Sequence, residues 1–256
     1  MRALLLLVLL ASPLVQAQPQ TSEQALDAVA FDQKIGARLP GDLAFQNQRG
    51  EPVDVAALAE DTPVLMVLAW YECPNLCPML LDQLAKAVKR LPFDSEEYQV
   101  VVASIDPQET PAEALNVERR LREKYGDVVN SWQLLTGDAQ SIDALTEAVG
   151  FEYAYDPERD SYAHPAGVVV LEPGAVVNRY LFGLKTNAPD LKLALVQAGQ
   201  GNLGSPVDQV VLRCYRFSPD SGQYNLAVLR LVKIVGSLFV LGMAGLIFVL
   251  WRRERK

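Results

Sequence analysis

One continuous apolar run, Val64–Trp70, constrains the fold of this chain more than any other feature. Its sequence, Val-Leu-Met-Val-Leu-Ala-Trp, has no polar position, so a strand formed by it cannot turn either face to water. Such a strand belongs in the middle of a sheet that helices cover on both sides. Residues 78–89 follow with apolar positions at helical spacing, and 99–105 is a second apolar run. This alternation predicts a three-layer α/β domain.

The alternation of strands and helices continues to residue 199. A short hairpin is expected around the turn at residues 47–50. The further elements expected are helix 111–125, strand 132–135, helix 142–149, strands 151–155, 167–171 and 176–182, and helix 190–198. A buried strand that runs into a cysteine-bearing loop and then a helix favours the thioredoxin-like version of this architecture. Residues 18–199 are therefore assigned to one thioredoxin-like domain.

The first 17 residues have the pattern of a secretory signal peptide. Arg2 precedes an apolar run, and small residues at Val15-Gln16-Ala17 fit a cleavage site. The apolar part would extend roughly 20 Å as a helix, whereas the core of a bilayer is about 30 Å thick. This length favours export with cleavage over the alternative, an uncleaved membrane anchor.

The C-terminal end has the pattern of a membrane anchor. Ile234–Trp251 contains no charged residue, and as a helix it would cover roughly 27 Å. The tail 252–256, Arg-Arg-Glu-Arg-Lys, indicates the cytoplasmic side. We therefore predict a linker and small hairpin at 200–232, a transmembrane helix at 233–251 and a basic cytoplasmic tail. The protein is expected in the cytoplasmic (inner) membrane as a single-pass protein, with its main domain on the periplasmic side.

Composition excludes several classes of function. The net charge of the chain is -8, and residues 18–232 carry 17 Lys and Arg against 30 Asp and Glu, a net of -13. A nucleic-acid partner is not expected, because that role requires a basic surface. Three cysteines are too few for a disulfide scaffold or a four-cysteine zinc module. The single histidine excludes any site that needs two imidazoles.

Two cysteines follow the first buried strand, in the segment Cys73-Pro-Asn-Leu-Cys77-Pro78. Pro78 suits the first position of the next helix, which would place Cys77 at the helix N-terminus. The helix dipole should then lower the pKa of the Cys77 thiol. Cys73 lies within reach of Cys77. A C-x-x-C pair usually suits thiol–disulfide exchange, whereas the one additional residue here opens the loop and lets two sulfurs bind a metal ion. A stabilising disulfide remains geometrically possible, although closing so short a loop would contribute little entropy.

His164 is the one histidine of the chain, and it directly precedes the strand expected at 167–171. A single histidine is more often a surface or core residue than a metal ligand. In a thioredoxin-like domain, however, the loop before this strand faces the cysteine loop. His164 is therefore a candidate partner of the two thiols.

These residues together resemble the Sco/SenC family of copper chaperones for cytochrome oxidase. Four features match in order over residues 35–199: Cys73-Pro-Asn-Leu-Cys77-Pro78, Ser104-Ile-Asp106-Pro107-Gln-Glu-Thr-Pro111, His164 before a core strand, and the Leu-Glu-Pro-Gly turn after it. The resemblance implies a thioredoxin-like fold that binds one copper ion through Cys73, Cys77 and His164. Two thiolates and an imidazole suit Cu(I), and they are also a partial set for Cu(II).

The resemblance also implies a role and partners. The family serves assembly of the dinuclear copper (CuA) centre in oxidase subunit II, by copper delivery, by reduction of the target cysteines, or both. Subunit II or another copper protein is the expected partner, together with an upstream copper chaperone or thiol reductant. Familiar members are anchored by an N-terminal helix, whereas this chain is expected to have a C-terminal anchor.

Two further residues have open roles. Asp106 is either a neighbour of the metal ligands or a simple turn residue. Cys214, in Val-Leu-Arg-Cys-Tyr-Arg-Phe, is by default a small buried hydrophobe; the alternatives are a fourth thiol ligand and an intermolecular disulfide.

Three functions remain to be distinguished. The first is a membrane-tethered copper-binding assembly factor, which need not be an enzyme. The second is a thiol–disulfide oxidoreductase without an obligatory metal, in which Cys73 or Cys77 is the catalytic nucleophile. A structural zinc or scaffold role is disfavoured, because the candidate ligands lie in loops at a helix start rather than in a closed four-ligand knot.

Overall fold

The computed structural model describes residues 30–184 and 186–199, Leu203, two short strands at 215–218 and 223–226, and residues 236–237, 239 and 241–243. A mixed sheet of seven strands forms the centre of the domain, in the order β2-β1-β5-β4-β3-β8-β9. Strands β3, β4 and β5 are mutually parallel, and β8 pairs antiparallel with β3. The strands are β1 Phe45–Gln46, β2 Pro52–Val53, β3 Val64–Ala69, β4 Gln99–Ser104, β5 Gln133–Gly137, β8 Gly167–Glu172 and β9 Val176–Phe182.

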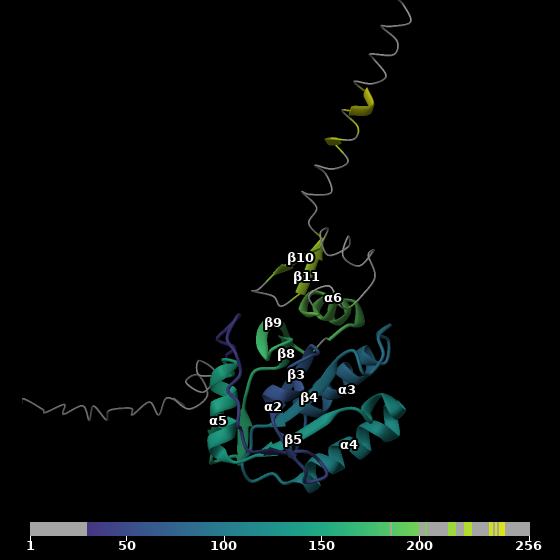
Figure 1. The fold of residues 1–256 in the computed structure, drawn as a ribbon. Coiled ribbons are helices and arrows are strands. Elements are labelled where there is room, and N and C mark those ends of the chain that lie inside the picture. Colours follow the sequence, from purple (N-terminus) through teal and green to yellow (C-terminus); the bar gives the residue numbers. More distant parts are fainter. Residues whose placement is uncertain are drawn as a thin grey trace, which may run out of the picture.

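Helices cover both faces of this sheet. The helices are α2 Val55–Leu58, α3 Leu76–Val88, α4 Pro111–Tyr125, α5 Ala139–Ala148 and α6 Ala188–Ala198. Apolar side chains of α3, α4 and α6 form a core with one face of β3, and those of α2 and α5 form a second core with the other face. Figure 1 shows the sheet between α5 on one side and α3 and α4 on the other. The expected three-layer α/β architecture is confirmed.

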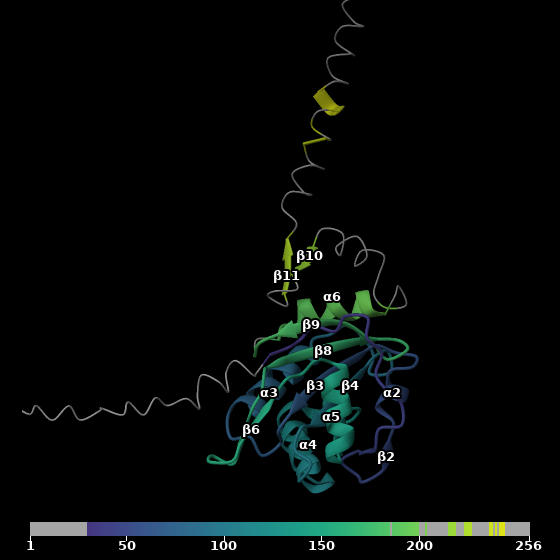
Figure 2. The ribbon, with the colours of Figure 1, turned by 90° about the vertical axis from the view of Figure 1, so that its left-hand side faces the viewer.

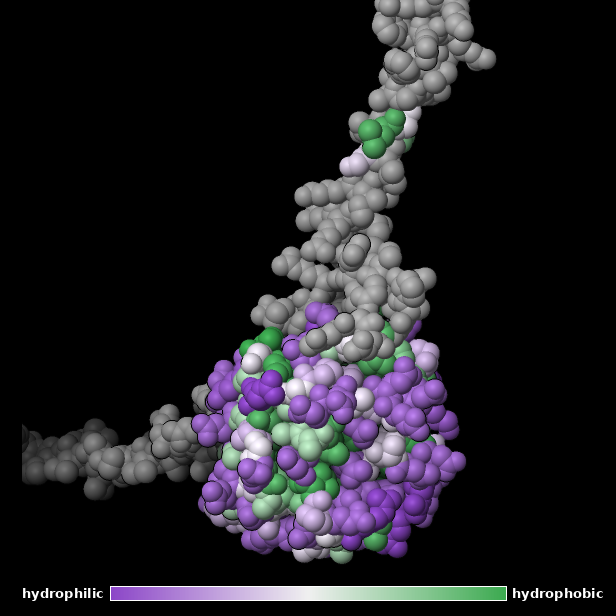
Figure 3. Space-filling view, in the orientation of Figure 1, coloured by the Kyte–Doolittle hydropathy of each residue, from purple (hydrophilic) through white to green (hydrophobic). Residues whose placement is uncertain are grey.

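The central elements form where the local sequence favours them. All six side chains of β3 are buried, as the continuous apolar run predicts. Helix α4 begins at a capping box in which Thr110 and Glu113 satisfy each other's backbone N–H groups, with Pro111 in the first turn. Its outer surface is polar, and hydrophilic side chains cover the part of the molecule in Figure 3 where Figure 1 places α4.

Several elements differ from expectation; α5, for example, begins at Ala139, three residues before the start expected at 142. The strand expected at 151–155 is shorter and shifted: β6 Ala154–Asp156 pairs with β7 Ser161–Ala163 in a separate two-stranded sheet. Figure 2 shows this pair as an arm at the edge of the domain. Its side chains are only partly buried, so it lacks the apolar cover that a core strand needs. Helix α3 begins at Leu76, two residues earlier than expected, and its N-cap residue is Asn75.

The chain beyond residue 199 is described only in part. Strands β10 Tyr215–Ser218 and β11 Gln223–Leu226 pair antiparallel, within the segment for which the sequence predicts a hairpin. Among the described residues, no helix has the length and apolar character needed to cross a membrane. The predicted signal peptide 1–17, Cys214 and most of the predicted span 233–251 lie outside the described residues.

Candidate functional site

The three predicted site residues come together at one end of the sheet, where β3 ends and β8 begins. Cys73 lies in the loop after β3, Cys77 lies in the first turn of α3, and His164 precedes β8. Because β8 runs antiparallel to β3, the beginning of β8 lies at the same end of the sheet as the end of β3. Sγ of Cys77 is 3.0 Å from Nε2 of His164. The Cys73 and Cys77 side chains also form a hydrogen bond, and both cysteines are free thiols.

His164 presents its unprotonated nitrogen to Cys77. Its Nδ1 lies 2.9 Å from the carbonyl oxygen of Pro165, which can only accept, so the hydrogen-bond network assigns the ring proton to Nδ1. Nε2 therefore carries a lone pair directed at the Cys77 sulfur. Burial lowers the pKa of His164, and the bond to Pro165 opposes this only partly. The neutral imidazole, which is the form that binds metal ions, is thus the favoured one.

Cys73 is the more acidic of the two thiols. Burial alone would raise its pKa, but hydrogen bonds from the backbone of Cys77, Asn75 and Leu76 lower it, and the net shift is downward. The side chain of Asn75, the N-cap residue of α3, makes no capping hydrogen bond. The sulfur of Cys73 therefore accepts from N–H groups at the start of α3 that an N-cap side chain normally satisfies.

Cys77 behaves in the opposite way, and the predicted lowering of its pKa is wrong. Its side chain is only 2% exposed, and this burial is the largest cause of a raised pKa. A hydrogen bond from the Trp70 backbone opposes the shift, whereas the negative charges of Cys73 and Glu109 add to it. The prediction failed because α3 begins at Leu76, so Cys77 lies inside the first turn and faces the core.

Glu109 is a residue of the site that sequence reasoning missed. Its side chain is 7% exposed, and it accepts hydrogen bonds from the hydroxyl of Ser104 and, at 2.9 Å, from the backbone N–H of Glu72. Burial raises its pKa to about 7, although these hydrogen bonds act in the other direction. Glu109 lies within the motif 104–111, but no pattern in that motif distinguishes it from an exposed carboxylate.

Asp106 is a turn residue that also acts on the histidine side of the site. Its carboxylate accepts the backbone N–H of Gln108 at 2.9 Å, which is the turn role that the sequence allowed. The pKa of Tyr162 is raised, first by burial and then by the charge of Asp106 and a hydrogen bond to it. Tyr162 precedes His164 by two residues. The described hydrogen bonds of Asp106 reach neither the two thiols nor the imidazole, so Asp106 is connected to the histidine side of the site through Tyr162.

The donor set fits a soft metal ion after a small adjustment. In the described part of the chain, no group of three or more His, Cys, Asp or Glu side chains is already arranged to hold a metal ion. For tetrahedral bonds of the lengths that zinc makes, about 2.3 Å to sulfur and 2.1 Å to nitrogen, the two ligand atoms lie about 3.6 Å apart. The Cys77 sulfur and the His164 nitrogen would have to separate by roughly 0.6 Å from the 3.0 Å that they have now.

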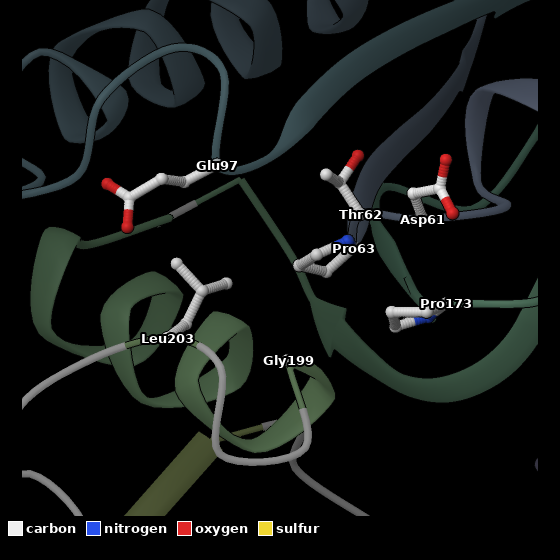
Figure 4. Close-up of a pocket in the computed structure, with 7 residues that line it drawn as sticks. All are labelled: Asp61, Thr62, Pro63, Glu97, Pro173, Gly199 and Leu203. Carbon is white, nitrogen blue, oxygen red and sulfur yellow. The ribbon is translucent and has the colours of Figure 1, made fainter.

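The opposite end of the sheet holds a pocket of a different kind. A cavity of about 190 Å³ is lined by Asp61, Thr62, Pro63, Glu97, Pro173, Gly199 and Leu203 (Figure 4). Pro63 directly precedes β3, whereas the thiols follow it, so this cavity and the thiols lie at opposite ends of that strand. Its lining contains no cysteine or histidine. The chemistry of the described domain is thus concentrated at the thiol end.

Solved structures share this fold. A protein of Aquifex aeolicus VF5 matches with a TM-score of 0.58 and 22% identity, over 65% of this chain and 95% of that chain. Arabidopsis thaliana ScoI, solved with copper bound, matches with a TM-score of 0.52 and 17% identity, over 65% and 98%. BsSco, described as a member of the Sco family of cytochrome c oxidase assembly proteins, matches with 0.53 and 19%, over 67% and 98%. At these identities the likeness shows the mixed α/β, thioredoxin-like fold.

The family of the chain is given by its sequence. The comparison with curated proteins gives no match. The SCO1/SenC family matches residues 32–194, which is more than half of the chain and includes Cys73, Cys77 and His164. The chain therefore belongs to the SCO1/SenC family.

Proposed function

We propose that this protein binds one copper ion through Cys73, Cys77 and His164 and serves the assembly of a cytochrome oxidase copper centre. The observation that carries the proposal is the contact of the Cys77 sulfur with the lone pair of His164 Nε2 at 3.0 Å, with Cys73 hydrogen-bonded to Cys77. Family membership supports it, as does the copper held by Arabidopsis thaliana ScoI, which has the same fold.

The chemistry of the donors suits copper as a cargo. Two thiolates and one imidazole form a soft set that favours Cu(I) and still accepts Cu(II). The N–H groups at the start of α3 already stabilise negative charge on Cys73. Cys73 is also partly exposed, whereas Cys77 is buried. An incoming ligand from a partner protein would thus reach the site from the Cys73 side. The proposed recipient is the CuA site of oxidase subunit II.

We also propose a location for this activity. The signal pattern at 1–17 and the uncharged segment 234–251 support an exported domain that a C-terminal helix tethers to the inner membrane. The test is fractionation of cells that express the full chain, with protease added to intact spheroplasts. The domain should remain with the membrane and be digested from outside; recovery of an intact protein in the cytosol would contradict the proposal.

The copper proposal is tested by metal binding of the purified protein. The reduced wild-type protein should bind one equivalent of Cu(I) in competition with a chelator, and His164→Ala should bind it more than about 100-fold more weakly, since loss of a ligand exceeds the effect of losing a residue that only supports one. His164→Gln serves as a variant of similar size without the imidazole. Tight one-to-one binding by both histidine variants would exclude the three-ligand site.

A second function is favoured by the properties of Cys73. A partly exposed thiol with a lowered pKa is suited to attack a disulfide. The Cys73 thiolate would form a mixed disulfide with one sulfur of a partner, and the other partner sulfur would leave as a thiolate. Cys77 would then lose its proton and attack Cys73, which releases the second partner thiolate and leaves a Cys73–Cys77 disulfide. A thiol reductant would return this disulfide to two thiols.

The two functions differ in their need for His164. Disulfide exchange requires both cysteines but no imidazole, whereas the copper site requires all three residues. Oxidase activity should therefore be measured in cells that carry His164→Ala in place of the wild-type gene. Loss of activity that added copper restores supports copper delivery. Full activity in ordinary medium supports the reductase function.

A further inference from the structure

We propose that Glu109 is a positioning residue, whose buried carboxylate holds the backbone leading into Cys73 against the end of β4. This inference deepens the proposed copper function, because it names what fixes the loop that carries one of the ligands. Glu109 lies 36 residues after Cys73 in the sequence and belongs to the loop between β4 and α4.

The carboxylate of Glu109 joins two segments through hydrogen bonds. One oxygen accepts the backbone N–H of Glu72 at 2.9 Å, and the backbone N–H of Tyr71 also bonds to the carboxylate. The other oxygen accepts the hydroxyl of Ser104, the last residue of β4. A carboxylate that accepts several N–H and O–H groups forms stronger bonds than a neutral acceptor would. The two residues that precede Cys73 are thereby tied to β4.

Few other backbone bonds hold this loop. The N–H of Cys73 donates to the carbonyl of Trp70 at 3.2 Å, and Pro74 has no N–H to donate. The phenol of Tyr71 lies within 2.8 Å of the carbonyls of Val102 and Leu135, which fixes the ring of Tyr71 beneath the neighbouring strands. Glu109 fixes the backbone at the same place. The backbone of residues 71 and 72 is therefore held from outside the loop by the carboxylate of Glu109, in addition to the anchored phenol of Tyr71.

Burial of this carboxylate indicates a specific role. Only two glutamates of the described residues are buried, Glu109 and Glu118. Glu118 is on α4 and pairs with Arg122 of the same helix at 3.4 Å. Glu109 faces no cation in a described ion pair, and its partners are instead the backbone of the cysteine loop and the Ser104 hydroxyl. Glu118 is thus a matched control: a buried glutamate that does not touch the loop.

The test compares Glu109→Ala with Glu118→Ala in the metal-free, reduced protein. Hydrogen exchange of the backbone amides of residues 71 and 72 should be about 10-fold or more faster in Glu109→Ala, because their acceptor is gone. The same amides should exchange at the wild-type rate in Glu118→Ala, after correction for any loss of global stability. If Glu109→Ala fails to fold, Glu109→Gln replaces it, since glutamine keeps the size and only one acceptor oxygen.

A second measurement, the affinity for Cu(I), tests whether holding the loop also positions Cys73 as a ligand. The dissociation constant for Cu(I), measured by chelator competition, should rise about 10- to 100-fold in Glu109→Ala and stay near the wild-type value in Glu118→Ala. The thiolate-to-copper absorption of the Cu(II) form should also shift in Glu109→Ala alone. Glu109→Asp, which keeps the charge, should recover part of the affinity.

The outcomes separate this inference from the proposed function. Unchanged exchange at residues 71 and 72 in Glu109→Ala overturns the inference, and so does an equal acceleration in Glu118→Ala. Faster exchange with a wild-type copper affinity also overturns it, because the positioning would not serve the ligand. If the wild-type protein itself binds no copper, the proposed function fails, and the exchange rates alone decide whether Glu109 holds the loop.

Discussion

Two neighbouring regions of the site, the loop that carries Cys73 and the first turn of α3 that carries Cys77, place the same chemical group in opposite environments. In the loop the sulfur is partly exposed and bonded to backbone N–H groups, and its pKa is lowered. In the first turn the sulfur is buried against the core beside His164, and its pKa is raised. Four positions along the chain thus separate a reactive thiol from a protected one.

The difference shows where the N-terminus of a helix exerts its effect. The free N–H groups of the first turn point away from the helix, toward a group that precedes it. Cys73 occupies that position, whereas Cys77 lies within the turn and is governed by burial. A thiol therefore gains acidity from a helix by lying before it rather than by belonging to it.

The largest expected effect is the loss of Cu(I) affinity when either sulfur is removed. Cys73→Ser and Cys77→Ser should each weaken Cu(I) binding more than about 1,000-fold, since loss of a ligand exceeds the 10- to 100-fold effect of losing a residue that only supports one. The two variants should differ in stability, because only Cys77 is packed in the core. Chelator competition and urea unfolding measure the two effects, with Glu97→Gln at the other end of the sheet as control. Tight Cu(I) binding by either serine variant would contradict the proposal that both sulfurs are copper ligands.

The next effect concerns Glu109, which bonds to the Cys73 loop and whose charge raises the pKa of Cys77. Its own pKa is about 7 in the folded protein against 4.5 as the ordinary value, so the unfolded state releases the proton first. Folding stability should therefore fall by about 3 kcal/mol as pH rises from 4.5 to 7 and stay level above that.

Glu109→Gln tests this pH dependence, because it lacks the titrating group. The stability of the wild type relative to Glu109→Gln should decline over the interval from pH 4.5 to 7, as measured by urea unfolding at several pH values. His164 contributes a slope of the opposite sign, since its lowered pKa makes the folded protein gain stability as pH rises toward 6.5. Both proteins contain His164, so its slope cancels in the difference. Parallel curves would show that folding does not raise the pKa of Glu109.

A smaller effect is expected in the reactivity of the two thiols. In the reduced, metal-free protein at pH 7.5, iodoacetamide should modify Cys73 at least about 20-fold faster than Cys77, because the thiolate is the reactive form. Peptide mass spectrometry in a Cys214→Ser background assigns the rates. Denaturation in urea should make the two rates similar, and equal rates in the folded protein would remove the distinction between the two positions.

The smallest expected effect is on the stability of α3 when Asn75 is replaced, because the Cys73 sulfur and not the Asn75 side chain accepts hydrogen bonds at the start of this helix. Asn75→Ala should change the free energy of unfolding by less than about 0.5 kcal/mol, because its side chain makes no capping bond. Asn187→Ala is the matched control: Asn187 caps α6 by accepting the Asp190 N–H at 2.9 Å, and its loss should cost about 1 kcal/mol. A cost for Asn75→Ala equal to that of Asn187→Ala would mean that Cys73 does not replace the side-chain cap.

The sequence was sufficient for the parts of the fold that local patterns determine. The apolar run Val64–Ala69 was typical of a central strand, and the helix expected at 111–125 is α4 with the same bounds. The position of His164 near the cysteines followed from the thioredoxin-like architecture, in which the loop before this strand faces the cysteine loop. These features depend on periodicity and topology, which are legible along a single chain.

Other features depend on direction in space and were not predictable. The pKa assignment of the thiols failed because a two-residue shift in the start of α3 turns Cys77 inward. The role of Glu109 depends on which way its side chain points from a loop, and the residue type does not encode this. The arm of β6 and β7 has aromatic residues that resemble a core strand, although Tyr155 is 50% exposed.

The antiparallel pairing of β3 with β8 sets how far His164 lies from the cysteine loop. Val64 pairs with Leu171, Leu65 with Val170 and Met66 with Val169, so the position of the segment before β8 relative to the end of β3 is set by this register. An insertion in an exposed turn such as 157–160, between β6 and β7, would not change this register. One residue added between His164 and β8 would instead move the imidazole about 3.3 Å along the strand and turn it to the other face. The three residues from His164 to β8 must therefore keep their number if the imidazole is to stay beside Cys77.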